Sequence, residues 1–91
     1  MAHSVQNMVT ATTASQLVVE GTDGQAKTGF IWNNSTTDYV RVSCGTPSSG
    51  TVGVLLKPAT PFPIYLAAAT SIYVSRDTTA ATDVECVVFY A

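Results

Sequence analysis

The chain has 91 residues, of which 46% are hydrophobic and only 11% are charged, and its formal net charge is −2. This length suits a single domain. The four basic residues are scattered along the chain, which argues against a nucleic-acid-binding surface, because phosphate binding requires clustered Lys and Arg. The sequence has no apolar run of about 18 residues that could cross a membrane. Met1–Asn7 also lacks the pattern of a secretory signal.

The polar residues are mostly Thr and Ser rather than Lys and Glu. Threonine packs well on a pleated surface, so this composition favours strands over helices. A surface with so little charge has little electrostatic protection against association. We therefore expect a protein that works within an assembly.

The N-terminal segment, Ser4 to Thr13, has Val5, Met8 and Val9 among polar residues, without a clean period. We expect residues 1–13 to form either an edge strand or an arm that reaches onto a neighbour. A short strand over Gln16–Glu20 follows, and the Asp23-Gly24 pair predicts a tight turn. Residues 14–91 are expected to form one β-sandwich domain.

The clearest pattern lies between Phe30 and Gly45, which we interpret as two strands joined by a polar corner and as the core of the sheet. The second strand alternates with a period of two. Its residues would face opposite ways in two sets, Tyr39, Arg41 and Ser43 on one side and Val40, Val42 and Cys44 on the other.

The second half of the chain continues with short strands separated by turn residues. Gly45–Gly50 predicts a loop, and Gly53 predicts a bulge or a close backbone approach. Three prolines within Lys57–Pro63 predict a bend or an edge strand, because proline donates no ladder hydrogen bond. Further strands are expected at Thr51–Leu56, Ile64–Leu66, Ser71–Ser75 and Asp83–Tyr90, whereas Ala67–Ala69 remains ambiguous and could be a helical turn.

The last of these strands is apolar on both faces, which predicts a central strand or an oligomer contact. One face carries Val84, Cys86, Val88 and Tyr90, and the other face carries Val87 and Phe89. Seven or eight short strands at roughly ten-residue spacing are typical of an antiparallel sandwich or a small barrel. We therefore expect an all-β fold, a small antiparallel β-sandwich of jelly-roll type.

Residues suited to catalysis or metal binding are few. His3 is the only histidine and lies in the terminal segment, where no rigid frame would hold it as a catalytic base. Asp77 and Asp83, which flank one loop, are read as solvated charges. Cys44 and Cys86 could pair if their strands are neighbours, but we expect two reduced, buried thiols. The sequence predicts no enzyme activity, no catalytic residue, no cofactor and no metal site.

The aromatic residues leave two interpretations open. Trp32, Tyr39, Tyr65, Tyr73 and Tyr90 could form a platform on which a sugar stacks. Alternatively, Trp32 and Tyr73 fill the core or a subunit interface, which is the more common arrangement in a small domain.

Several segments together resemble small bacteriophage virion proteins. These segments are Phe30–Ser35, Tyr39–Gly45, Gly53–Pro58, Ile72–Val74 and Val87–Tyr90. The likeness covers Thr28 to Tyr90 and consists of β-strand and turn chemistry. The sequence departs from that pattern at Ala59, where glycine is expected after Lys57-Pro58.

The resemblance implies a structural virion component of the capsid decoration (cement) type, assembled in the host cytoplasm. Its expected partners are the major capsid protein or another virion protein, together with further copies of itself in a dimer or trimer. The candidate contact residues are Val5, Met8, Val9, Phe62, Trp32 and Tyr39. The alternative function is a carbohydrate- or receptor-binding module, as in a fibre or spike.

Overall fold

A computed structural model describes residues 5–21, 26–66 and 70–91, and these residues form eight strands and no helix. The strands are β1 (Val5–Ala11), β2 (Gln16–Val19), β3 (Lys27–Asn33), β4 (Val40–Cys44), β5 (Val54–Leu56), β6 (Pro61–Leu66), β7 (Ile72–Arg76) and β8 (Val84–Tyr90). The predicted all-β class is therefore confirmed. The Asp23-Gly24 turn and the ambiguous Ala67–Ala69 segment lie outside the described residues.

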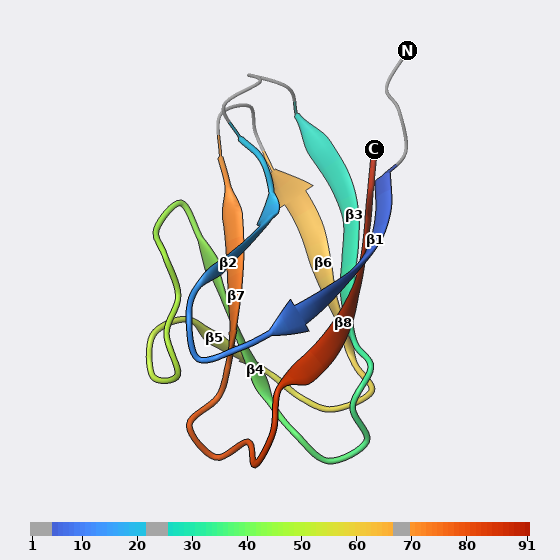
Figure 1. The fold of residues 1–91 in the computed structure, drawn as a ribbon. Helices are drawn as coiled ribbons and strands as arrows, with labels where there is room; N and C mark the ends of the chain where they lie inside the picture. The colour runs from blue at the N-terminus through green and yellow to red at the C-terminus, as the bar shows by residue number, and fades with distance from the viewer. Residues whose placement is uncertain (1–4, 22–25, 67–69) are drawn as a thin grey trace.

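The strands form two antiparallel sheets of four (Figure 1). Sheet A has the order β1-β8-β3-β6, and sheet B has the order β2-β7-β4-β5. Along the chain, β1 pairs with β8, β2 with β7, β3 with β6 and β4 with β5. The first half of the chain thus runs antiparallel to the second half, and successive pairs alternate between the two sheets.

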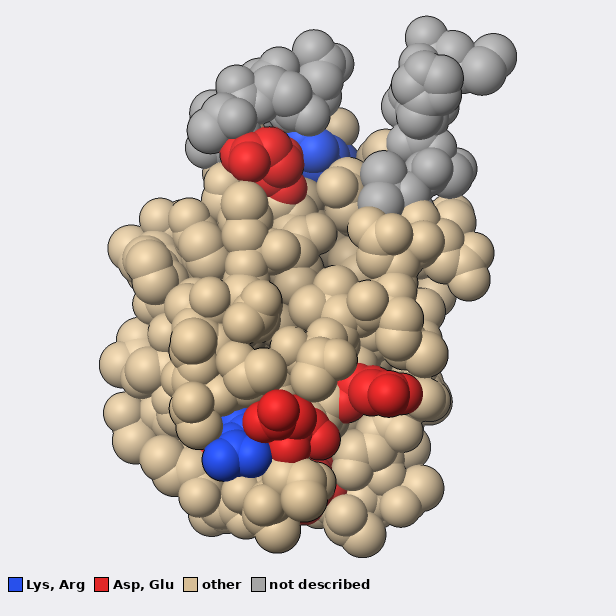
Figure 2. All heavy atoms as spheres, in the orientation of Figure 1, with Lys and Arg blue, Asp and Glu red and all other residues tan. Residues whose placement is uncertain are grey.

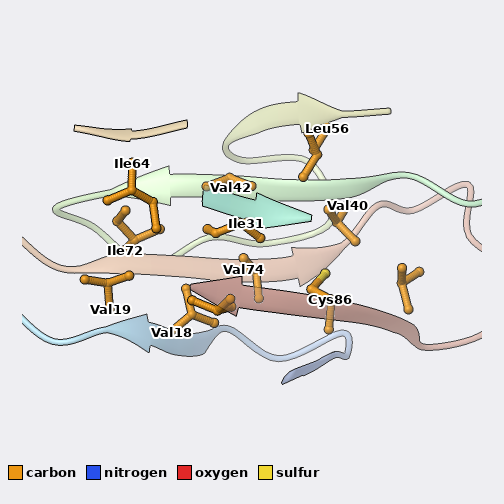
Figure 3. Close-up of a cluster of buried hydrophobic side chains, with 13 residues drawn as sticks. Val18, Val19, Ile31, Val40, Val42, Leu56, Ile64, Ile72, Val74 and Cys86 are labelled. Carbon is orange, nitrogen blue, oxygen red and sulfur yellow. The ribbon is translucent and has the colours of Figure 1, made fainter. Parts of the chain in front are cut away.

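One hydrophobic core is built from the facing sides of both sheets (Figure 3). Period-two alternation places every second residue of a strand on this side. On β8 the buried residues are Val84, Cys86 and Val88, as expected, and β8 is a central strand of sheet A. The core comprises Ala11, Val18, Val19, Ile31, Val40, Val42, Leu56, Ile64, Ile72, Val74, Val84, Cys86 and Val88.

The two strands between Phe30 and Gly45 do not pair with each other, which corrects the interpretation of this stretch as the core of one sheet. β3 belongs to sheet A and β4 to sheet B, and the polar corner between them carries the chain across. Asn33, which is fully buried, holds this crossing in place. Its Nδ2 donates to the carbonyls of Asp38 at 2.9 Å and Leu56 at 3.2 Å, and its Oδ1 accepts from the Ser35 amide at 3.0 Å.

The proline-rich segment contains both a bend and an edge strand. β6 begins at Pro61, earlier than the expected start at Ile64, and forms the edge of sheet A beside β3. Only alternate N–H groups of an edge strand donate to its neighbour, here β3, and the others point away from the sheet. Pro61 and Pro63 fit the positions whose N–H groups would point away, so their lack of an N–H costs no ladder hydrogen bond. By contrast, β5 is shorter than expected, because Ser49 and Val52 close a backbone turn (N···O 3.1 and 3.3 Å) just before it.

Gly53 makes the close approach that its position in the sequence predicted. Its φ is +127°, and a Cβ added there would lie 2.9 Å from the carbonyl oxygen of Val42. Replacing Gly53 would therefore strain the backbone and crowd β4.

Ala59 adopts the left-handed conformation that favours glycine, with φ 51°. We expect Ala59→Gly to raise the free energy of unfolding by up to about 1 kcal/mol, because relief of the left-handed strain exceeds the extra chain entropy of glycine. Thermal unfolding should then shift upward by a few degrees. The matched control is Ala81→Gly, an exposed alanine outside the left-handed region, which should lower the melting temperature. Equal shifts for the two variants would contradict the assignment of strain to Ala59.

Candidate functional site

The outer side of sheet A carries a continuous set of apolar side chains. Alternation along each strand places these residues opposite those that enter the core. Pairing then aligns them in rows, with Phe30 opposite Phe89 and Pro63, and Trp32 opposite Val87 and Pro61. We call this surface the aromatic face, and it comprises Met8, Phe30, Trp32, Pro61, Pro63, Tyr65, Val87 and Phe89.

Large parts of the aromatic face are open to solvent. Met8 is 59% exposed, Phe30 40% and Tyr65 88%. Because an aromatic side chain can bury about 150–250 Å², the exposed parts of Phe30 and Tyr65 alone amount to roughly 250 Å². With Met8 added, the face approaches the roughly 300–600 Å² of the largest apolar patch on a typical monomeric protein, and such a patch is often a functional site.

The aromatic face is also held in shape by its own contacts. The rings of Phe30 and Phe89 stack with centroids 5.8 Å apart and an interplanar angle of 27°. Both residues lie on paired strands of a four-stranded sheet, which restricts their backbone movement. A partner would therefore meet a largely preformed surface, which reduces the ordering cost of binding.

Charge is nearly absent from this side of the protein. Among the described outward-facing strand residues of sheet A, Glu85 is the only one with a charged side chain. In the view of Figure 2, in which β1 and β2 lie in front, charged groups appear near the top and in the lower half of the molecule, with an uncharged surface between them. Contact with such a surface would depend on apolar burial and shape rather than on ion pairs.

The outer side of sheet B differs, because the loop between β4 and β5 packs against it (Figure 1). Ser48 of this loop lies buried, with its Oγ 2.6 Å from Oγ of Ser75 on β7. The Ser48 amide donates to Oγ of Ser15 at 3.1 Å, and the Thr78 amide donates to the Gly50 carbonyl at 3.2 Å. This loop is a polar cover over the middle of sheet B, where the outer residues Ser43 and Ser75 are buried, and Leu17 and Leu55 beside it stay exposed.

Arg41 of β4 forms an ion pair with Asp77 and connects the loop between β4 and β5 to sheet B. Arg41 Nε donates to Asp77 Oδ1 at 2.7 Å, and Arg41 Nη1 donates to the Gly53 carbonyl at 3.1 Å. Asp77 is buried and also accepts hydrogen bonds from the amide and hydroxyl of Thr79. These hydrogen bonds, with a smaller contribution from Arg41, lower the pKa of Asp77 to about 2. The reading of Asp77 as a solvated loop charge was wrong.

The two cysteines differ from each other. Cys86 is buried, and burial raises the pKa of its thiol to about 12. Cys44 is exposed at the end of β4, so the prediction of two buried thiols was wrong for Cys44. Neither forms a disulfide, since both are free and they lie on different sheets.

Of the candidate contact residues, the structure places Met8 and Trp32 on the aromatic face. Val9 and Phe62 are partly buried on the inner side and pack against the core. Tyr39 is half-buried beside sheet B, where its carbonyl accepts from the Asp77 amide at 3.1 Å. Val5 belongs to β1, and its side chain lies outside the described part of the structure.

Sequence reasoning missed Phe30, the two β6 prolines and the outward position of Phe89. A signal was present, because Phe30 and Trp32 alternate with Ile31, so that β3 is apolar on both faces like β8. A strand with two apolar faces in a two-sheet protein has one side in the core and the other on the surface. Which side is outside depends on the partner sheet and cannot be read from alternation alone.

The described ranges contain neither a metal-binding cluster nor a membrane-spanning helix. No group of three or more His, Cys, Asp or Glu residues in the described ranges could hold a metal ion. The described residues include no helix long and apolar enough to span a membrane. His3 lies outside these residues.

Comparison of the chain with protein-family models, with curated proteins and with solved structures gives no match.

Proposed function

We propose that this chain is a non-enzymatic structural component of a bacteriophage virion, a capsid decoration (cement) protein that binds the shell through the aromatic face and acts as a homo-oligomer. The observation that carries the proposal is the contrast between the two sheets. On the outer side of sheet B the loop of the same chain buries Ser43 and Ser75 and leaves the aliphatic Leu17 and Leu55 exposed, whereas the outer side of sheet A presents exposed Met8, Phe30 and Tyr65 beside a stacked Phe30–Phe89 pair.

We further propose that the two sheets form a sandwich of jelly-roll type. Support comes from the pairing of the first half of the chain with the second, in an order that alternates between sheets. Jelly rolls of eight strands are common in viral capsid proteins and in lectins. The resemblance of Thr28–Tyr90 to small virion proteins favours the first of these two classes.

The mechanism of binding follows from the chemistry of the face. An uncharged apolar surface gains free energy when contact with a shell removes it from water, at about 25 cal/mol per Å². Because ion pairs would contribute little, binding should persist at high salt, and excluded salts such as sulfate should strengthen it. The shell site would then present a matching apolar surface at a junction between capsomers.

The test is co-sedimentation with virus particles from the cells that produce the protein. We expect the unaltered chain to sediment with the particles in a density gradient, and the double variant Phe30→Thr/Tyr65→Ser to bind at least roughly 30-fold more weakly, as for a pair of interface anchors. Leu55→Thr is the matched control, because Leu55 is 44% exposed but lies on sheet B. Circular dichroism of all variants checks that the fold is retained.

Two outcomes would contradict the proposal. The unaltered chain could fail to sediment with particles, or the double variant could bind as well as the control. A loss of binding between low and high salt would contradict the apolar mechanism while leaving the virion partner in place.

Carbohydrate binding is the second candidate, favoured by the 88% exposure of Tyr65, whose ring offers an apolar face and a polar tip for sugar stacking. A glycan array separates the two functions. Saturable glycan binding that is lost in Tyr65→Ser, together with no attachment to particles, would favour the carbohydrate-binding module. Trp32 lies on β3 of sheet A, whereas Tyr39 lies just before β4 of sheet B, so Tyr65 rather than a Trp32–Tyr39 pair is the candidate stacking residue.

A further inference from the structure

The two sheets have four edges, and three of them are poorly suited to pairing with another strand. β6 carries Pro61 and Pro63, which remove outward-facing donors. β5 has only three residues. β2 has four residues, and its register with β7 shifts between Leu17 and Val19. Short, bulged or proline-containing edges are the usual means by which proteins avoid edge-to-edge association.

The fourth edge, β1, has none of these features. It has seven residues, and all of them pair with β8 in an uninterrupted register. No other strand of the described residues pairs with its free side. Its sequence, Val-Gln-Asn-Met-Val-Thr-Ala, contains no proline, no glycine and no charged residue. Such an edge is a template for a further strand.

The chemistry of β1 suits an identical strand. A second copy would bring no like charges together, because the strand has none, and Figure 2 shows an uncharged surface where Figure 1 draws β1. Two antiparallel copies related by a two-fold axis at Met8 would use all seven residues. In that register Met8 meets Met8 of the other copy, Asn7 meets Val9, and Val5 meets Ala11. Each pair lies on one side of the sheet, because its members are separated by an even number of residues.

We infer that β1 is an interface between two copies of this chain, which join through β1 to form one continuous eight-stranded sheet. A two-fold axis perpendicular to the sheet keeps both aromatic faces on the same side. Met8, which is 59% exposed in one copy, then lies at the joint between the two faces. A second copy of the chain therefore continues the aromatic face of the first across the joint.

The interface is small, and this sets the strength of the association. A seven-residue strand is about 23 Å long, so pairing alone buries less area than the roughly 1,200–2,000 Å² of a standard stable interface. The expected dimer is therefore weak and concentration-dependent. This inference does not rest on virus particles, and it would hold whatever the aromatic face binds.

Light scattering across a concentration series tests the interface. The chain has a mass of 9.5 kDa, so the expected mass rises toward twice that value. Met8→Lys places two positive charges opposite each other at the axis, and it should raise the dimer dissociation constant at least about tenfold. Met8→Glu should do the same. An equimolar mixture of the two variants should restore the dimer, because the opposite charges then face each other.

Two control variants separate β1 pairing from other contacts. Leu55→Lys adds the same charge to an exposed apolar position of sheet B, and Tyr65→Lys adds it to the aromatic face far from β1 in strand order. Both should dimerise like the unaltered chain. A mass of 9.5 kDa at every concentration, dimerisation unaffected by Met8→Lys, or disruption by Tyr65→Lys alone would overturn the inference. The light-scattering series uses the purified chain without particles, so its outcome is independent of the virion proposal.

Discussion

Gly29→Ala is expected to lower the free energy of unfolding by about 3 kcal/mol or more, a large part of the roughly 5–14 kcal/mol that a chain of this length has available. Gly29 lies in β3 between its two neighbours, opposite Tyr90 of β8 and Ile64 of β6. A Cβ added there would lie 1.9 Å from the carbonyl oxygen of Phe89 and 2.6 Å from Cα of Tyr90. Backbone atoms cannot rotate away as a flexible side chain can, so the β3–β8 pairing itself must shift.

Urea unfolding followed by circular dichroism measures this effect. Gly45→Ala is the matched control, because a Cβ at Gly45 meets nothing within 4 Å and its φ of +85° adds only backbone strain, about 1 kcal/mol. The loss for Gly29→Ala should clearly exceed the loss for Gly45→Ala. Equal losses, or an unchanged midpoint for Gly29→Ala, would show that the two strands do not approach as closely as described.

Asp77→Asn is expected to destabilise the protein by about 1–3 kcal/mol, because an amide NH2 group replaces an oxygen of the buried carboxylate and cannot accept the hydrogen bonds from Arg41 or Thr79. Asp77 connects Arg41 of β4 with Thr79 in the loop after β7, and Arg41 in turn holds the carbonyl of Gly53. The substitution should therefore loosen the cover of sheet B. Hydrogen exchange should speed up at the Thr78 amide, which donates to Gly50.

The same carboxylate makes stability depend on pH in a defined direction. Its pKa falls from 3.8 in the unfolded chain to about 2 in the folded protein, chiefly through the hydrogen bonds from Thr79. The unfolded chain therefore binds the proton more tightly, and the contribution of Asp77 is fully present above about pH 4. It should be lost as the pH falls from about 4 to about 2, and Asp77→Asn should reduce the slope of unfolding free energy in that window.

Asp83→Asn is the matched control for both measurements. Asp83 also pairs with an arginine, Arg76 at 3.0 Å, but its side chain is 49% exposed, and exposed ion pairs contribute about 0–1 kcal/mol. Its removal changes the net charge equally and should have a small effect. If Asp83→Asn matched Asp77→Asn in stability and in pH dependence, general charge rather than the buried network would be responsible.

The two surfaces proposed for binding follow from one asymmetry in the molecule. On sheet B the loop between β4 and β5 buries Ser43 and Ser75 of the outer face, and both edge strands are short. Sheet A leaves its outer face and the β1 edge open, and only the β6 edge is protected by prolines. This arrangement suits a protein that binds a partner surface through the face of sheet A and a second copy of itself through the β1 edge.

The sequence by itself determined the class of the fold and most strand positions, because these depend on local chemistry. Alternation in β4 and β8, the turn residues between segments and the prolines of β6 all act within a few residues of each other. The sequence also showed alanine at position 59, where glycine was expected. The left-handed φ of Ala59 explains that expectation, because glycine adopts this conformation without strain. The functional assignment, in contrast, came from a resemblance and stays a prediction.

Only the tertiary structure decided which strands pair and which faces remain outside. Alternation defines two faces of a strand but is symmetric between them, so Phe30 and Ile31 looked equally suited to the core until the partner sheet was placed. Arg41 and Asp77 are 36 residues apart, and no local pattern joins them. Likewise, β3 and β4 are adjacent in sequence yet lie in different sheets, because non-local pairing with β8 and β7 determines where each strand belongs.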